Sequence, residues 1–161
     1  MEKILSVNHF DDYKKFRDEL IGKKRISIIG AGLIGCEFAN DLAAAGYQVD
    51  VIDISAQPLG RLLPPEGGAF IRQKLEAVGV VFHLNTSTQS VEQENGRLRL
   101  TFSEGRSIES DLVLSAVGLL PRTQLAAAAG IQINRGIMVN RLLQTQFANI
   151  YALGDCAEVE G

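Results

Sequence analysis

The stretch RISIIGAGLIGCEFANDLAAAGYQVDVIDI, residues 25–54, decides the fold of this chain. It opens with a short apolar run, Arg25–Ile29, that is typical of a buried strand and leads directly into the glycines of residues 30–35. Good helix formers over residues 36–45 predict a helix that ends at the next glycine, and residues 47–54 predict a second strand. A strand, a helix and a strand joined so closely predict a parallel β-α-β unit with a right-handed crossover.

The glycines of this stretch follow the pattern Gly-x-Gly-x-x-Gly immediately after the first predicted strand. Gly30 permits a sharp turn, Gly32 lets a diphosphate approach bare backbone, and Gly35 allows the helix to pack closely on the strand. The first turn of the helix offers unpaired N–H groups and a partial positive charge to the phosphates. We therefore expect a dinucleotide diphosphate to lie on Gly30, Ala31, Gly32, Leu33, Ile34 and Gly35.

An acidic residue supports this interpretation, because a glycine turn alone also occurs where it only packs a helix onto a strand. Asp53 closes the second predicted strand, 23 residues after Gly30, near the spacing of about 20 that dinucleotide sites show. A carboxylate there accepts hydrogen bonds from the adenosine ribose hydroxyls and repels a 2′-phosphate. No arginine directly follows Asp53, and Arg61 is the nearest, so the sequence favours NAD(H) over NADP(H).

The chain after this unit predicts further strands and an antiparallel insert. Short alternating segments separated by Asn95-Gly96 and Glu104-Gly105 are typical of hairpins. The predicted fold class is therefore α/β, a Rossmann-like parallel sheet with helices on both faces and a small antiparallel three-stranded insert. The predicted elements are a helix over residues 64–78, a strand over 80–83, antiparallel strands over 90–93, 98–102 and 106–109, and a buried strand over 111–116.

Three parts are expected along the chain: a linker helix over residues 1–22, the NAD(H)-binding Rossmann domain over 23–118, and a further segment over 119–161. Asn8 is a candidate cap for the first helix. After residue 118 the β-α-β pattern stops, and the predicted elements are a short helix over 123–129 and strands over 137–139 and 150–152.

Composition excludes several classes of protein. The net charge is −3, which gives no reason to expect a nucleic-acid partner. No long uncharged apolar run and no signal-peptide pattern are present, so we expect no membrane span and a cytoplasmic location. Cys36 and Cys156 form no C-x-x-C pair, and both are interpreted as small apolar residues rather than a redox dithiol. His9 and His83 lack matching ligands at metal-binding spacing, so no metal is expected.

Three motifs in order resemble the FAD-dependent pyridine nucleotide-disulfide oxidoreductases. Residues 26–55 resemble the NAD(H) domain of that family, residues 114–122 (LSAVGLLPR) its A-x-G-x-x-P segment, and residues 150–158 (IYALGDCAE) its second flavin motif. The resemblance implies NAD(H) and FAD as cofactors. It implies that Gly154 and Asp155 contact FAD, with the aspartate on the ribityl chain. Glu37, otherwise a plain surface glutamate, would lie near the nicotinamide, and Gly118 close to the dinucleotide.

Within this family the chain is similar to the rubredoxin–NAD⁺ reductases, over residues 30–46 and 126–136, among others. That likeness implies a flavoprotein reductase that passes electrons from NADH through FAD to rubredoxin or another small iron-containing acceptor. The hydride would pass from NADH to the flavin with no side chain acting as acid or base, so no catalytic residue is assigned.

The family resemblance also implies that the chain is part of a longer protein. Complete members begin with another Gly-x-Gly-x-x-Gly for the ADP part of FAD, and this chain has one such pattern. We therefore expect residues 119–161 to be the start of the second half of an FAD-binding domain, and the chain alone to be inactive. Flavorubredoxin reductase, ferredoxin reductase, NADH oxidase and coenzyme A disulfide reductase remain alternatives, as does a non-catalytic NAD-sensing domain.

Overall fold

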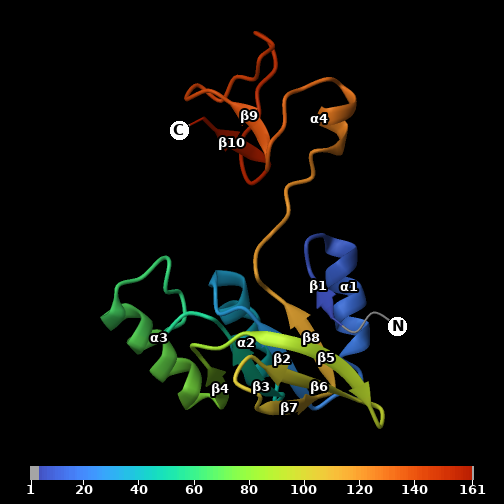
Figure 1. Cartoon of the computed structure of the whole chain (residues 1–161), viewed down its shortest axis with the longest axis vertical. Helices are drawn as coiled ribbons and strands as arrows, with labels where there is room; N and C mark the ends of the chain where they lie inside the picture. The colour runs from blue at the N-terminus through green and yellow to red at the C-terminus, as the bar shows by residue number, and fades with distance from the viewer. Residues whose placement is uncertain (1–3, 161) are drawn as a thin grey trace. The chain divides into compact units, whose positions relative to one another are not determined.

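The computed structural model describes residues 4–160 and divides the chain into two compact units, one ending at Gly118 and one beginning at Leu119. Figure 1 labels their helices and strands. The first unit contains a parallel sheet, an antiparallel sheet and three helices, and the second is small. Each unit is described by itself.

A five-stranded, wholly parallel sheet forms the centre of the first unit, in the order β1-β8-β2-β3-β4. This order confirms the predicted parallel β-α-β unit, because β2 and β3 lie side by side with helix α2 between them in sequence. Alternate residues of each strand point to opposite faces, and both faces are apolar at the centre of the sheet. The strands are β1 (Leu5–Ser6), β2 (Arg25–Ile29), β3 (Gln48–Ile52), β4 (Val80–His83) and β8 (Leu112–Ser115).

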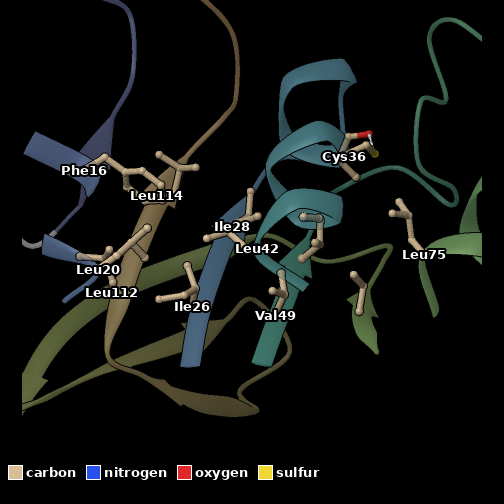
Figure 2. Close-up of a cluster of buried hydrophobic side chains, with 14 of the residues drawn as sticks. Phe16, Leu20, Ile26, Ile28, Cys36, Leu42, Val49, Leu75, Leu112 and Leu114 are labelled. Carbon is tan, nitrogen blue, oxygen red and sulfur yellow. Dashed lines mark hydrogen bonds between the residues drawn. The ribbon is translucent and has the colours of Figure 1, made fainter. Parts of the chain in front are cut away.

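Helices α1 (Phe10–Glu19), α2 (Leu33–Ala44) and α3 (Pro65–Ala77) contribute to one core on one face of the sheet. Figure 2 shows side chains of these helices over β2, β3 and β8. Burial of such apolar side chains is the main stabilising contribution to the unit. The core includes Phe16 and Leu20 from α1, Cys36 and Leu42 from α2, Leu75 from α3, and Ile26, Ile28, Val49, Leu112 and Leu114 from the strands.

The opposite face is covered by the antiparallel sheet of β5 (Thr88–Glu94), β6 (Arg97–Phe102) and β7 (Ser107–Ser110). The parallel sheet and the three-stranded insert are confirmed, but the prediction of helices on both faces is wrong. Ile52 and Val113 point away from the helices and form a second core with Leu100 and Phe102 of β6. The strands had to bury both faces, and the insert supplies the apolar cover for the second one.

The start of α1 differs from the prediction by one residue. His9, not Asn8, is the N-cap, and its Nδ1 accepts a hydrogen bond from the Asp11 amide at 3.3 Å. Asn8 instead donates its backbone N–H to the Asp12 carboxylate at 3.0 Å. Phe16 is 1% exposed, so α1 is built into the core of the first unit.

The second unit contains α4 (Gln124–Ala128) and two parallel strands, β9 (Ile137–Val139) and β10 (Ala157–Val159). The strand predicted over 150–152 is wrong, because Tyr151 forms only an isolated bridge to Gln144. The strand that pairs with β9 is instead β10. Glu158 of β10 also accepts hydrogen bonds from the Arg135 and Gly136 amides, both at 2.8 Å. Over residues 4–160, no helix combines the length and the apolar character that crossing a membrane requires.

Candidate functional site

A cleft of about 500 Å³ opens at the carboxyl ends of the parallel strands in the first unit. This volume falls within the range of roughly 300–1,000 Å³ that is typical of small-molecule sites. In open α/β sheets, ligands bind at this edge of the sheet. Three segments and the end of β8 form its walls: the glycine turn after β2, the loop after β3, and the segment after β4. The residues lining it include Gly30, Ala31, Gly32, Asp53, Ser55, Leu59, Arg61, Thr86, Ser87, Thr88 and Ala116.

The glycine turn can be formed only by glycine at two of its three glycine positions. Gly30 has a φ of +108°, and a Cβ there would lie 2.6 Å from the Ala116 carbonyl oxygen. A Cβ at Gly35 would overlap the Gly30 carbonyl oxygen. The close approach of α2 to β2 therefore depends on Gly35 having no side chain.

Gly32 differs from the other two glycines because nothing lies within 4 Å of the position of its missing Cβ. It is exposed, it is the N-cap of α2, and no side chain caps this helix end. The first N–H groups of α2 therefore have no side-chain acceptor from the cap residue, and the space beside them is open. This is the arrangement that a phosphate group needs at a helix N-terminus.

Asp53 is fixed at the cleft by two backbone amides. Its Oδ2 accepts a hydrogen bond from Ala31 at 2.6 Å, and its Oδ1 accepts one from Ser55 at 2.7 Å. A carboxylate has about four lone-pair sites, so two remain for hydroxyl groups of a ligand. Proximity of Asp53 to the glycine turn was predicted from spacing, but its direct hydrogen bond to Ala31 was not.

The loop after β3 is attached to the glycine turn by a second hydrogen bond, from the Leu59 amide to the Ala31 carbonyl at 2.8 Å. Leu59 adopts a φ of +55°, which is uncommon for a residue with a branched side chain. This loop brings Arg61 to the same cleft as Asp53. The sequence identified Arg61 only as the nearest arginine, and its position in the cleft comes from the path of the loop.

The segment after β4 forms a wall that the sequence did not predict. Thr86, Ser87 and Thr88 line the cleft and lead into β5. The Thr86 hydroxyl hydrogen-bonds to the Glu104 carboxylate and lies 3.2 Å from the Ser103 hydroxyl. The only sequence signal for this wall was a run of hydroxyl residues after a predicted strand.

Glu104 links this wall to the turn between β6 and β7. Arg106 donates hydrogen bonds to Glu104 Oε1 from Nε at 3.0 Å and from Nη2 at 2.5 Å. The hydrogen bond from the Thr86 hydroxyl is the largest of the effects that lower the pKa of Glu104 to about 2, and its own backbone amide and Arg106 add to it. Thr86 of the wall and Glu104 and Arg106 of the turn between β6 and β7 therefore form one hydrogen-bonded polar cluster.

The other predicted site residues do not line the cleft. Leu33 is the first residue of α2 and exposed, Ile34 is half-buried beside it, and Glu37 is exposed on the same helix. Gly118 is exposed, with a φ of +135°, although its neighbour Val117 does line the cleft. Gly154 and Asp155 are exposed residues of the second unit. Of the predicted site residues, the structure brings Gly30, Ala31, Gly32 and Asp53 together along the cleft.

Cys36 lies under the glycine turn, with its Sγ 3.5 Å from the Ala31 carbonyl oxygen. Burial raises the pKa of this thiol to about 11, and the charges of Asp53 and Glu37 add to the effect. His83 is occupied elsewhere, since its Nε2 lies 2.8 Å from Asp50 Oδ1 on the face of the sheet that the insert covers. Neither residue presents a reactive group to the cleft.

Comparison with known proteins assigns this architecture to a family. The chain is 48% identical over 159 residues to a rubredoxin-NAD(+) reductase of Acinetobacter baylyi, a match that covers 96% of the chain and 40% of that protein. It is 44% identical to a nitric oxide reductase FlRd-NAD(+) reductase of Klebsiella pneumoniae, covering 99% of the chain and 42% of that protein. The chain therefore spans about two fifths of the length of these relatives.

A solved structure shows the same fold. The ferredoxin reductase for the CYP199A2 system of Rhodopseudomonas palustris superimposes with a TM-score of 0.87 and 32% identity, covering 97% of this chain and 39% of that one. The sequence profile of the family described as pyridine nucleotide-disulphide oxidoreductase matches residues 2–161. The resemblance drawn from the three sequence motifs is thereby confirmed, and the chain belongs to the pyridine nucleotide-disulphide oxidoreductase family.

Proposed function

We propose that this chain is the NAD(H)-binding domain of an NADH-dependent flavoprotein reductase. The observation that carries the proposal is the cleft at the carboxyl edge of the sheet, where a carboxylate is hydrogen-bonded to the glycine turn. The open space beside Gly32 fits a diphosphate at the start of α2. The remaining lone pairs of Asp53 fit the two hydroxyls of the adenosine ribose.

Electrostatics favours the unphosphorylated dinucleotide. The Asp53 carboxylate is held in the cleft wall by Ala31 and Ser55, so it cannot move away from a 2′-phosphate without breaking two hydrogen bonds. Repulsion between these anions disfavours NADPH. Among the described residues that line the cleft, Arg61 is the cation that would offset part of that repulsion.

In the complete protein, NADH and FAD supply hydride and electron transfer when both are bound. This chain contributes by positioning the dinucleotide: the glycine turn and α2 hold the diphosphate, and Asp53 orients the ribose. Glu37 and Gly118 are proposed to lie toward the nicotinamide half. Gly154 and Asp155 are proposed to contact FAD, as the resemblance of residues 150–158 to the family's flavin motif implies.

The proposed electron acceptor is rubredoxin, because the relative from Acinetobacter baylyi is a rubredoxin-NAD(+) reductase. A flavorubredoxin is the second candidate, since the FlRd-NAD(+) reductase of Klebsiella pneumoniae has nearly the same identity to this chain. Steady-state oxidation of NADH by the complete protein with purified rubredoxin or flavorubredoxin as acceptor separates the two. A higher kcat/KM with flavorubredoxin would reverse the preference.

Isothermal titration of this chain with NADH and with NADPH tests the cofactor assignment. We expect NADH to bind more tightly than NADPH by at least about tenfold, which corresponds to one unfavourable charge contact of about 1.4 kcal/mol. Equal or tighter binding of NADPH would contradict the role assigned to Asp53. No binding of either dinucleotide would contradict the proposed function itself.

A further inference from the structure

The hydroxyl of Thr88 is a buried polar group without a partner in the wall of the cleft. Among residues 4–160, the buried side-chain oxygens without a hydrogen bond are Thr88 Oγ1 and Ser27 Oγ. Ser27 lies within β2, away from the cleft, whereas Thr88 lines it. A buried hydroxyl without a hydrogen bond costs free energy, so a contact that satisfies Thr88 Oγ1 is favoured.

The backbone around Thr88 is fixed by several contacts. The Thr86 amide donates to the Asp53 carbonyl at 3.1 Å, and the Ser103 amide donates to the Ser87 carbonyl at 2.9 Å. Thr88 pairs with Phe102, and the register then shifts before Ser90, which marks a β-bulge. Bulges of this kind re-aim side chains beside functional sites. The wall is therefore held in place while one rotation about χ1 turns the Thr88 hydroxyl.

The position of Thr88 relative to Asp53 identifies the part of the ligand that it faces. In the proposed binding mode, the diphosphate lies on the glycine turn and the ribose on Asp53. The base is attached to C1′ of the ribose and the phosphates to C5′, so the base extends beyond Asp53, away from the glycine turn. In the sheet order β2-β3-β4, the segment of residues 86–88, which follows β4, lies on the opposite side of β3 from the glycine turn, and the backbone hydrogen bond from Thr86 to Asp53 joins it to the end of β3.

We propose that Thr88 reads the base of the dinucleotide, with its hydroxyl turning into the cleft to accept a hydrogen bond from the exocyclic amino group of adenine. This inference rests on the proposed function and adds a specificity-determining residue to it. The Thr86–Glu104–Arg106 cluster holds the wall at the correct place, and Thr88 supplies the contact.

Titration with NADH and with its 1,N6-etheno analogue, in which a bridge blocks the amino group, tests the inference. We expect Thr88→Val to weaken NADH binding about fivefold to tenfold, the effect of one lost hydrogen bond, and to leave binding of the etheno analogue unchanged. Thr88→Ser, which keeps the hydroxyl, retains the affinity for NADH. Thr101→Val, the same change on β6 outside the cleft, leaves both affinities unchanged.

The thermal stability of these variants separates base recognition from a structural role. Thr88→Val removes a hydroxyl that makes no hydrogen bond, so we expect its melting temperature to equal or exceed that of the wild type. Equal weakening of both ligands by Thr88→Val, or no weakening of either, would overturn the role of Thr88 while leaving NAD(H) binding intact. Failure of the wild type to bind NADH would instead overturn the proposed function.

Discussion

The amide of Ala31 donates a hydrogen bond to the carboxylate of Asp53 across a distance of 2.6 Å. One residue belongs to the turn that is proposed to hold the diphosphate, and the other ends the strand that is proposed to hold the ribose. Ala31 also accepts a hydrogen bond from the Leu59 amide. The two halves of the candidate site therefore form one rigid unit, and a change at Asp53 affects both.

Asp53→Ala is expected to lower both stability and NADH affinity. The amides of Ala31 and Ser55 lose a charged acceptor, so we expect the free energy of unfolding to fall by about 2 kcal/mol. NADH affinity is expected to fall at least about tenfold, because the ribose loses its acceptor as well. Chemical denaturation and isothermal titration measure the two effects. Asp41→Ala, which removes an exposed carboxylate from α2, is the matched control. An unchanged affinity in Asp53→Ala would contradict the assignment.

The glycines of the turn are expected to separate folding from binding. Gly35→Ala is expected to destabilise the first unit by about 1–3 kcal/mol or more, since its Cβ would overlap the Gly30 carbonyl. Gly32→Ala meets open space at a φ of −73°, so we expect a change in stability below about 1 kcal/mol. Its methyl group occupies the space proposed for the diphosphate, so NADH binding is expected to be lost.

Thermal unfolding and isothermal titration of both glycine variants check this separation. Gly32→Ala serves as the control for Gly35→Ala, because both add one methyl group to the same turn. A Gly32→Ala protein that binds NADH like the wild type would show that the diphosphate lies elsewhere.

Cys36 is expected to resist alkylation in the folded protein. Its thiol is buried and its pKa is raised to about 11, so little thiolate is present at mildly alkaline pH. Iodoacetamide followed by mass spectrometry should label Cys156, which is partly exposed, and label Cys36 only after denaturation. A Cys156→Ser variant is the control, because any label on it can come only from Cys36. Labelling of Cys36 at the rate of Cys156 without denaturant would contradict the burial of Cys36.

Glu104 is expected to make stability depend on pH in the acid range. Its pKa is lowered to about 2 from 4.5, so its contribution is complete above pH 4.5 and is lost as the pH falls from there toward 2. Thr86→Val removes the largest cause of this shift, so we expect the pKa of Glu104 to rise. The wild type should therefore be more stable than Thr86→Val at neutral pH, with a difference that shrinks as the pH falls below 4.5.

Thermal unfolding at a neutral and an acid pH measures this dependence on Glu104. Thr101→Val is the control, because its hydroxyl has no contact with Glu104 among the hydrogen bonds of the cluster. A difference between wild type and Thr86→Val that stays constant with pH would show that the Thr86 contact does not depend on the charge of Glu104.

Local sequence patterns predicted most of the fold. The β-α-β unit follows from an apolar run, a glycine turn and helix formers, and the structure places β2, α2 and β3 within a few residues of their predicted bounds. The insert was also predicted, because Asn95-Gly96 and Glu104-Gly105 mark its turns. The position of the insert over one face of the parallel sheet was not predicted. Alternation along a strand shows that a face is buried, but it does not show which element covers that face.

Predictions were weakest where long-range pairing or a single hydrogen bond decides the outcome. Residues 150–152 have the composition of a strand, yet β10 forms at Ala157–Val159 because that segment aligns with β9. In the cleft, Asp53 was found by its spacing from Gly30. The wall at Thr86–Thr88 was missed because the path from β4 into β5, rather than any local pattern, brings it there.

The placement of β8 between β1 and β2 has a consequence for synthesis on the ribosome. Ile26 pairs with Leu112, so one edge of β2 stays unpaired until residues far along the chain have emerged. At about 5–20 residues per second, that delay lasts roughly 4–17 seconds. During that time Ile26 and Ile28 lie on an open strand edge, which is prone to aggregation. A truncation that keeps the hairpin insert but removes β8 would make this transient exposure permanent, and such a product would be a substrate for chaperones and proteases.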